Sequence, residues 1–306
     1  MYRRAKSYTV ELIVMPGPAS LELGGRIAEK LGFDSHPVDH RIFPDGESYI
    51  RLTAPVEGET VVVVQTTFPN PDRGVVQLLL MVRAAKDLGA ERVVCVVPYL
   101  AYSRQDKRFR EGEALSLDTV VALLDDAGGD DLIVVDVHNE ESLERLQEKT
   151  SLGIVNLSAM PLLAGHLKGL GFEGAYSLSP DEGAKHLADA AARVLGGGSG
   201  FFEKIRDRKT GEIEMAVKDI DLGGKDAVVF DDIISSGGTT AAAVRGLKNQ
   251  GAKRVAAACA HGLFMGGAEE RIRDAGTDLI LSTDTVLTSL SRVTVAGLIA
   301  DHLDKI

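Results

Sequence analysis

The residues best suited to chemistry lie in the segment AVVFDDIISSGGTT, residues 227–240. A buried, strand-like run leads into Asp231 and Asp232, at the carboxyl end of a strand where α/β sheets bind ligands. A loop of serine and glycine then opens a helical pattern, whose N-terminus and backbone N–H groups suit a phosphate monoester. The carboxylates can accept hydrogen bonds from sugar hydroxyls. The segment predicts a site for a phosphorylated sugar, whereas an aspartate pair alone would equally fit a solvated turn.

Two dense basic segments could supply the local positive charge that an anionic substrate needs. The first, RQDKRFR at 104–110, follows a strand-like run, and the second, FFEKIRDRKTGE at 201–212, follows the glycine-rich stretch 196–200. Guanidinium groups bind phosphate oxygens in bidentate fashion. Read alone, the first segment could be a solvated loop and the second the approach to an exposed hairpin. The glycine-rich stretch reads as a flexible connector or as a hinge.

The elements that must position these groups alternate along the chain. Helical patterns separate short β-branched runs, which indicates parallel sheets with crossover helices. The expected strands are 61–64, 92–97, 132–137, 227–230 and 255–260, and the expected helices are 77–88 and 239–250.

An internal repeat indicates two similar domains. GAERV at 89–93 and GAKRV at 251–255 each follow a helix and open a strand, and the strand–loop–helix order upstream is shared. We predict α/β domains over 1–152 and 153–290, and residues 291–306 could pack on the first. Only the second copy carries an Asp-Asp pair after its strand, so the chemistry of that loop is expected in the second half.

Composition excludes several classes of protein. The 306 residues carry a formal charge of −11, with 44% apolar and 26% charged residues, which is typical of a globular protein and unlike a general nucleic-acid binder. Cys95 and Cys259 lie in apolar runs, so we expect reduced thiols and a cytoplasmic location rather than a disulfide framework. No apolar stretch reaches the roughly 18 residues of a membrane span.

Five further sequence motifs point to a particular family. They are FPDGE at 43–47, YLAYSRQDKRF at 99–109, GEALS at 112–116, SPDEGA at 179–184 and HGLF at 261–264. With the 227–240 segment, they make the chain resemble the ribose-phosphate pyrophosphokinase family, and its archaeal members most, from about residue 15 to about 300. The resemblance implies two tandem type I phosphoribosyltransferase-like domains, each a mostly parallel sheet flanked by helices. It also implies transfer of the β,γ-diphosphoryl group of MgATP to the 1-hydroxyl of ribose 5-phosphate.

The same resemblance implies residue roles. It assigns Lys204 and Arg206 to a mobile catalytic loop. The ribose 5-phosphate residues would be Asp231, Asp232, Ser235, Ser236, Gly237, Gly238 and Thr239. The ATP residues would be Phe43, Asp45, Glu47, Arg104, Gln105, Asp106 and His138, with His138 and Asp181 associated with Mg²⁺. Because the hairpin with Phe43 serves a neighbouring subunit in the family, the resemblance implies a homo-oligomer, dimer or higher, with a shared active site.

Two alternatives stay open at this point. A phosphoribosyltransferase shares the 231–239 motif but usually needs one domain and neither FPDGE nor RQDKRF. A noncatalytic regulatory relative typically has a disrupted catalytic or phosphate loop, whereas both are intact here. The chain departs from the family at Ser236, where many members have threonine, and after His138, where Asn139 and Glu140 replace the common bacterial form.

Overall fold

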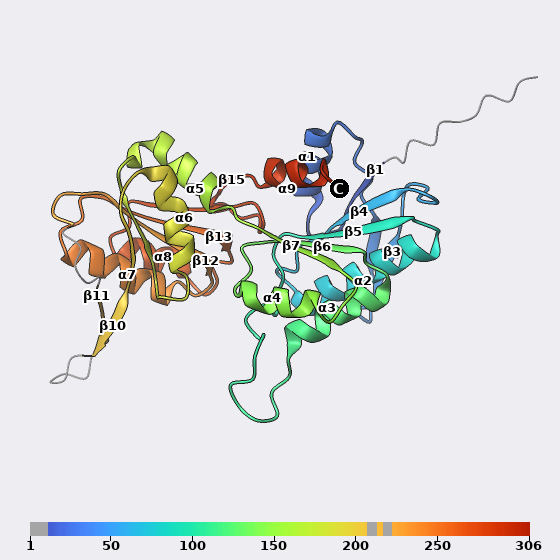
Figure 1. Cartoon of the computed structure of the whole chain (residues 1–306), viewed down its shortest axis with the longest axis horizontal. Coiled ribbons are helices and arrows are strands. Elements are labelled where there is room, and N and C mark those ends of the chain that lie inside the picture. Colours follow the sequence, from blue (N-terminus) through green and yellow to red (C-terminus); the bar gives the residue numbers. More distant parts are fainter. Residues whose placement is uncertain (1–11, 207–212, 217–221) are drawn as a thin grey trace, which may run out of the picture. The chain divides into compact units, whose positions relative to one another are not determined.

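The computed structural model describes residues 12–206, 213–216 and 222–306, which form two compact units (Figure 1). Unit 1 comprises Met1–Asn156 and Ala296–Ile306, and unit 2 comprises Leu157–Val295. The chain divides after Asn156, and β7 (Gly153–Leu157), which spans this point, is the last strand of the unit 1 sheet.

Unit 1 is built on a five-stranded sheet in the order β1-β4-β5-β6-β7. The pairs from β1 to β6 are all parallel, and their apolar residues are almost completely buried, as expected for a parallel sheet covered by helices. The other strands are β1 (Leu12–Pro16), β4 (Thr60–Val64), β5 (Arg92–Val97) and β6 (Asp131–Val135). The helices are α1 (Leu21–Leu31), α2 (Pro71–Asp87), α3 (Ser116–Ala127), α4 (Glu140–Gln147) and α9 (Ala296–Leu303).

Helix α2 begins earlier than predicted, and the chain ends in a helix of unit 1. Helix α2 begins six residues before the predicted helix, because Asn70 stands at its N-cap position and Pro71 occupies the first turn, where a missing N–H costs nothing. Helix α9 packs against α1, so residues 296–306 belong to unit 1. The preceding strand, β15 (Ser291–Val293), pairs instead within unit 2.

Unit 2 contains a six-stranded sheet in the order β15-β14-β13-β12-β8-β9, and every pair is parallel. One apolar face packs with α7 and α8, and the opposite face packs with α5 and α6. The strands are β8 (Tyr176–Ser179), β9 (Ser199–Phe201), β12 (Ala227–Ile234), β13 (Val255–Gly262) and β14 (Leu279–Thr283). The helices are α5 (Met160–Leu167), the π-helical turn η1 (Lys168–Phe172), α6 (Lys185–Leu195), α7 (Gly238–Asn249) and α8 (Ala268–Asp274).

The glycine-rich stretch is a packed entry to the sheet, so its interpretation as a flexible connector is wrong. A Cβ on Gly197 would lie 2.0 Å from the carbonyl oxygen of Ala175, and one on Gly198 would lie 2.5 Å from the Tyr176 ring. The chain then pairs with β8 as strand β9. Glycine is required here because the backbones approach closely.

The internal repeat extends to matching ion pairs. In unit 1, the Asp130 carboxylate lies 2.6 Å from Lys86 Nζ and accepts a hydrogen bond from the Val93 amide at 2.6 Å. In unit 2, Asp278 lies 2.7 Å from Lys248 Nζ and accepts from the Val255 amide at 2.7 Å. In both units an aspartate binds a lysine of the preceding helix and a backbone amide of the following strand. This shared arrangement supports a duplication.

A second ion pair predicts how unit 2 responds to acid. Arg254 donates to Asp226 through Nε at 3.1 Å and Nη2 at 2.5 Å, and this hydrogen bonding holds the pKa of Asp226 below its usual value despite partial burial. Because the folded-state pKa is depressed, the stabilisation is present above about pH 4 and is lost as pH falls through the folded pKa.

We therefore expect Asp226→Asn to lower the Tm of unit 2 by about 2–5 °C at pH 7, with a smaller difference from wild type below about pH 4. Calorimetry across pH would measure this. Glu270→Gln, which removes one negative charge from the exposed surface of α8, is the matched control and should show neither effect. A difference that stays constant down to pH 3 would contradict the assignment.

Candidate active site

The aspartate pair lies within strand β12 rather than after it. The strand continues through Ile234 because Ile233 and Ile234 still pair with His261 and Gly262 of β13. Asp232 is 8% exposed and Asp231 is half-buried. Their oxygens also fix the local backbone, since Asp231 Oδ1 accepts from the Asp232 amide at 3.0 Å and Asp232 Oδ1 accepts from the Ile233 amide at 2.8 Å. Two carboxylates are thus held rigidly near the carboxyl end of a parallel strand.

Negative charge is concentrated at this pair. Burial raises the pKa of Asp231 well above its ordinary value, and the nearby carboxylates of Asp232 and Asp181 raise it further. Asp181 follows β8, the neighbour of β12, and its Oδ1 accepts from the Ala184 amide at 3.2 Å. The structure therefore brings the predicted metal-associated Asp181 close enough to Asp231 to raise its pKa. The resulting site favours hydroxyl donors or a cation.

The phosphate loop, residues 235–239, has a shape that only glycine allows at its centre. Gly237 has φ 72°, and a Cβ there would lie 3.0 Å from Ile272 Cδ1 and 3.1 Å from Ala268. It is the N-cap residue of α7, whose first N–H groups have no partner within the helix. Ser236, Gly238 and Thr239 are exposed. The loop can therefore present backbone donors to an anion.

A brace behind this loop was missed by sequence reasoning. The Met265 amide donates to the Ser235 carbonyl at 2.9 Å, and Arg271 donates to the Ser236 carbonyl and, at 3.2 Å, to the Gly266 carbonyl. The HGLF motif entered the sequence analysis only through its resemblance to the family, which gave it no physical role. Nothing in the sequence indicated a role for Arg271. The brace engages the carbonyls of both serines, which fixes the shape of the loop.

In unit 1, the two segments predicted to bind ATP leave the same edge of the sheet. The loop with Arg104 and Gln105 follows β5, and His138 follows β6, which pairs with β5 in parallel. All three residues are exposed. The positive φ of 36° at Asp136 turns the chain between β6 and His138. Adjacent parallel strands therefore bring these residues to one edge, which is the usual ligand-binding edge.

Asp106, predicted beside Arg104 and Gln105, is placed differently. It is only 3% exposed, and its carboxylate accepts hydrogen bonds from Asn139 Nδ2 at 2.6 Å and Ser142 Oγ at 2.7 Å. Burial alone would raise the pKa of Asp106, but these hydrogen bonds and Lys107 outweigh it and the pKa is lowered. Because Asp106 is buried, a direct contact with ATP would require this part of the loop to move.

FPDGE forms the tip of a hairpin of β2 (Asp39–Ile42) and β3 (Ser48–Arg51). The Phe43 amide donates to the Glu47 carbonyl at 2.8 Å, which closes the turn. The Arg41 guanidinium lies 4.8 Å from the Phe43 ring centroid and 4.6 Å from that of Tyr49. Phe43 is half-buried, whereas Asp45 and Glu47 are exposed. The hairpin belongs to a separate two-stranded sheet that contacts α2, and not to the edge with Arg104 and His138.

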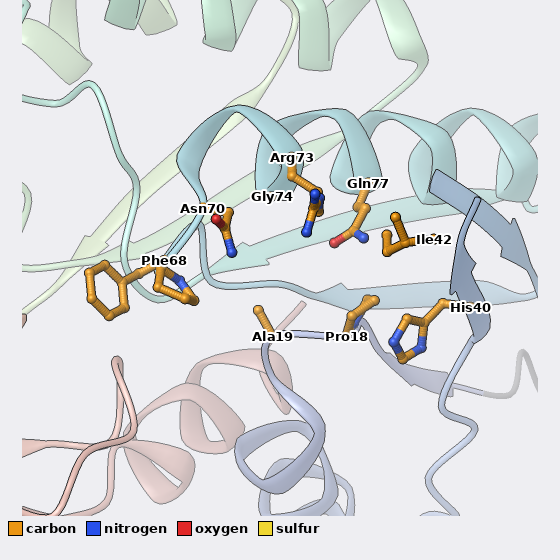
Figure 2. A pocket seen from close by; sticks show the side chains of 10 residues that line it. Pro18, Ala19, His40, Ile42, Phe68, Asn70, Arg73, Gly74 and Gln77 are labelled. Carbon is orange, nitrogen blue, oxygen red and sulfur yellow. The ribbon is translucent and has the colours of Figure 1, made fainter. Parts of the chain in front are cut away.

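A pocket of about 220 Å³ lies between this hairpin and α2. Figure 2 shows Asn70, the N-cap residue of α2, with Arg73 and Gln77 of that helix, facing Pro18 and Ala19 across it. The volume is below the roughly 300–1,000 Å³ of typical small-molecule sites. The pocket contains none of the predicted ATP residues, so it gives no support to an ATP site there.

Lys204 and Arg206 lie on β10 (Glu203–Arg206), whose backbone pairs with β11 (Ile213–Ala216) in antiparallel register. The structure thus places the predicted catalytic pair at the start of a hairpin. Arg208 and Lys209 of the same basic segment, to which no role is assigned, lie outside the described residues.

Fold and site together define a class of protein. Unit 2 is a parallel α/β unit with an aspartate pair followed by a glycine-centred loop, and it follows a second α/β unit, as in a two-domain α/β transferase. Residues 178–289 match the family model of the phosphoribosyl transferase domain, and residues 12–128 match that of the N-terminal domain of ribose phosphate pyrophosphokinase.

The chain belongs to the ribose-phosphate pyrophosphokinase family and is a transferase of that family. Enzymes with that name from Methanothermobacter thermautotrophicus and Saccharolobus solfataricus are 40% and 39% identical to it. The alignments cover 92% and 90% of this chain and 96% and 93% of theirs. The crystal structure of phosphoribosylpyrophosphate synthetase from Mycobacterium smegmatis matches 96% of this chain and 98% of its own, with 29% identity and a TM-score of 0.84. The expected tandem α/β fold is confirmed.

Proposed function

We propose that the chain transfers the β,γ-diphosphoryl group of ATP to the 1-hydroxyl of ribose 5-phosphate, giving phosphoribosyl pyrophosphate and AMP. The observation that carries this proposal is the pairing of rigid carboxylates with a braced anion loop on β12 and α7. Asp231 and Asp232 would accept hydrogen bonds from the ribose hydroxyls. The 235–239 loop would hold the 5-phosphate. Family membership over nearly the whole chain supports the same reaction.

We place the ATP site at the edge of the unit 1 sheet where β5 and β6 end. Arg104, Gln105 and His138 are exposed there on adjacent strands, and Arg104 can neutralise phosphate oxygens. Lys204 and Arg206 would stabilise the charge of the diphosphoryl group in transfer, since such transfer depends mainly on positioning and electrostatics.

Magnesium is the cation we propose for this reaction. The carboxylates of Asp181, Asp231 and Asp232 concentrate negative charge, and oxygen donors are the ligands that Mg²⁺ prefers. Within the described residues, no group of three or more histidine, cysteine, aspartate or glutamate side chains forms a metal cage. Mg²⁺ usually binds one or two carboxylates together with substrate phosphates and water. When bound, it would neutralise phosphate charge, and His138 and Asp181 are the residues proposed to hold it.

We further propose a homo-oligomer, dimer or higher, in the cytoplasm. The exposed hairpin tip with Asp45 and Glu47 supports a role in a neighbour's nucleotide site, since it stands apart from the ATP-side edge of its own unit. Cys95 and Cys259 are both buried and unpaired, in keeping with a reducing compartment. Among the described residues, no helix is long and apolar enough to span a membrane.

The decisive assay measures AMP released from ATP by the purified chain, with and without ribose 5-phosphate and Mg²⁺. We expect AMP and phosphoribosyl pyrophosphate to form in equal amounts, and only when ATP, ribose 5-phosphate and Mg²⁺ are all present. Absence of turnover despite nucleotide binding would favour the noncatalytic relative. Consumption of phosphoribosyl pyrophosphate with a purine or pyrimidine base would favour the phosphoribosyltransferase.

Subunit mixing tests the shared site. Phe43→Ala and Asp232→Asn alter different parts of one site, so each homogeneous variant should be weak or inactive. After exchange, some interfaces would pair an intact hairpin with an intact ribose loop, and the mixture should exceed the sum of its parents. A stacking contact is worth roughly 1–3 kcal/mol, enough for a clear effect on the KM for ATP. If exchange is confirmed by mass and activity stays at the sum, the hairpin serves its own subunit.

A further inference from the structure

Asp106 differs from the rest of the basic segment 104–110 because it is buried. The other six residues of this run are exposed, whereas Asp106 is 3% exposed. Figure 1 shows the long loop before α3 extending away from helices α3 and α4. A buried carboxylate is costly unless its hydrogen bonds are satisfied, so such a residue in an exposed loop needs partners. Its partners therefore show what Asp106 does.

The hydrogen-bond partners of Asp106 lie on α4 or at its N-terminus. Asn139 and Ser142 donate to the carboxylate at 2.6 and 2.7 Å, and Arg145 Nη2 donates to the Asp106 carbonyl at 3.0 Å. Arg145 Nη2 also lies 2.7 Å from Asp118 of α3. The loop after β5 is thus tied to the segment after β6 through both the side chain and the backbone of one residue.

The side chain of Asn139 makes a long-range contact from the start of a helix. Asn139 is the N-cap residue of α4, and its side chain makes no capping hydrogen bond to the first turn of that helix. Its amide nitrogen donates to the Asp106 carboxylate, 33 residues away in the sequence. The described contact of this side chain therefore joins α4 to the loop after β5.

The residue before Asp106 is held from the other side. The Leu117 amide donates to the Gln105 carbonyl at 3.4 Å, and Ser116 Oγ donates to Gln105 Oε1. Both donors belong to the first turn of α3. Consecutive loop residues are therefore fixed by two different helices, so the chain at Arg104 has little freedom.

We propose that Asp106, Asn139 and Ser142 form a clamp that positions Arg104 and Gln105 relative to His138 for nucleotide binding. This inference rests on the proposed function, because it takes those three residues to contact ATP. Arg104 and Gln105 directly precede Asp106, and His138 directly precedes Asn139. The clamp thus joins the two segments within two residues of each proposed contact. Asp106 acts through its neighbours and is a positioning residue.

The test compares Ser142→Ala and Asn139→Ala with Ser151→Ala. Ser151 is a matched control, since its hydroxyl also donates to an aspartate of unit 1, Asp125 at 2.5 Å, but its pair joins the start of β7 to the end of α3. We expect each clamp variant to raise the KM for ATP about fivefold to twentyfold. The KM for ribose 5-phosphate and the Tm should stay close to wild type, as should every parameter of the control.

A double-mutant cycle isolates the clamp from other effects. Asp106→Asn keeps the size of the side chain, and we expect Asp106→Asn combined with Ser142→Ala to raise the KM for ATP by less than the product of the single effects. Hydrogen exchange should also accelerate at the amides of residues 104–113 in the clamp variants and not in the control. Purely multiplicative effects, or an unchanged KM for ATP in both single variants, would overturn the proposal, as would an equal rise in both KM values.

Failure of the clamp can be told apart from failure of the proposed function. Hydrogen exchange of the 104–113 amides needs no substrate, and calorimetric titration with MgATP needs no turnover. If wild type forms no phosphoribosyl pyrophosphate, the proposed function fails, and these two measurements still decide whether the clamp orders a nucleotide site. If wild type turns over and the clamp variants bind MgATP as wild type does, the clamp alone is wrong.

Discussion

Replacing Lys204 or Arg206 by alanine is expected to lower kcat by on the order of 10²–10³ and to leave ribose 5-phosphate binding nearly intact. Both residues lie on β10, at the start of the β10–β11 hairpin. The residues proposed to bind ribose 5-phosphate lie on β12, the following loop and the start of α7. A cation that contacts only the transferring group stabilises the transition state more than the bound substrate, so the loss falls on kcat. Single-turnover AMP release and calorimetry with ribose 5-phosphate would separate the two quantities.

The matched control for these variants is Lys225→Ala. Lys225 is an exposed lysine of unit 2 that stacks on the Tyr176 ring at 5.0 Å, at the opposite end of β12 from the aspartate pair. It removes one positive charge from the same unit, and we expect its kcat to stay within about twofold of wild type. An unchanged kcat in both Lys204→Ala and Arg206→Ala would remove the catalytic hairpin from the mechanism, whatever the control does.

Asp232→Asn is expected to weaken ribose 5-phosphate binding by about 10- to 100-fold and to change ATP binding by less than about threefold. The substitution keeps the shape of the side chain and the fold of β12, but it removes a charged acceptor, and a hydrogen bond to a charged group is worth about 1.5–3 kcal/mol. Because the charge of Asp232 also raises the pKa of Asp231, the remaining carboxylate should ionise more readily in the variant. Calorimetry with each ligand separately measures both affinities.

Asp226→Asn is the control for this prediction. Asp226 immediately precedes β12, at the opposite end of the strand from Asp232, and it binds Arg254 rather than a ligand. The same substitution there should cost thermal stability and leave both affinities unchanged. If Asp232→Asn weakens ATP and ribose 5-phosphate equally, the aspartate pair supports the whole fold and is not a ribose site.

The sequence by itself determined the class of fold, and it predicted where an anion-binding loop would lie. Alternating strand and helix patterns predicted parallel sheets, and the predicted strand at 92–97 matches β5. Local chemistry was sufficient because buried parallel strands need continuous apolar runs and a tight phosphate loop needs glycine. The family strings then identified the enzyme class, which membership over most of the chain confirms.

Tertiary structure alone decided which side chains face a ligand and which hold the site together. Asp106 sits in a basic, polar segment and gave no sign of burial, because its partners Asn139 and Ser142 lie more than thirty residues away. Arg271 likewise reaches the phosphate loop from another helix. Glycines 197 and 198 suggested a flexible connector, but the neighbouring backbone of Ala175 and the ring of Tyr176 require them. Contacts between residues that are distant in the sequence set each of these roles, so local residue patterns do not predict them.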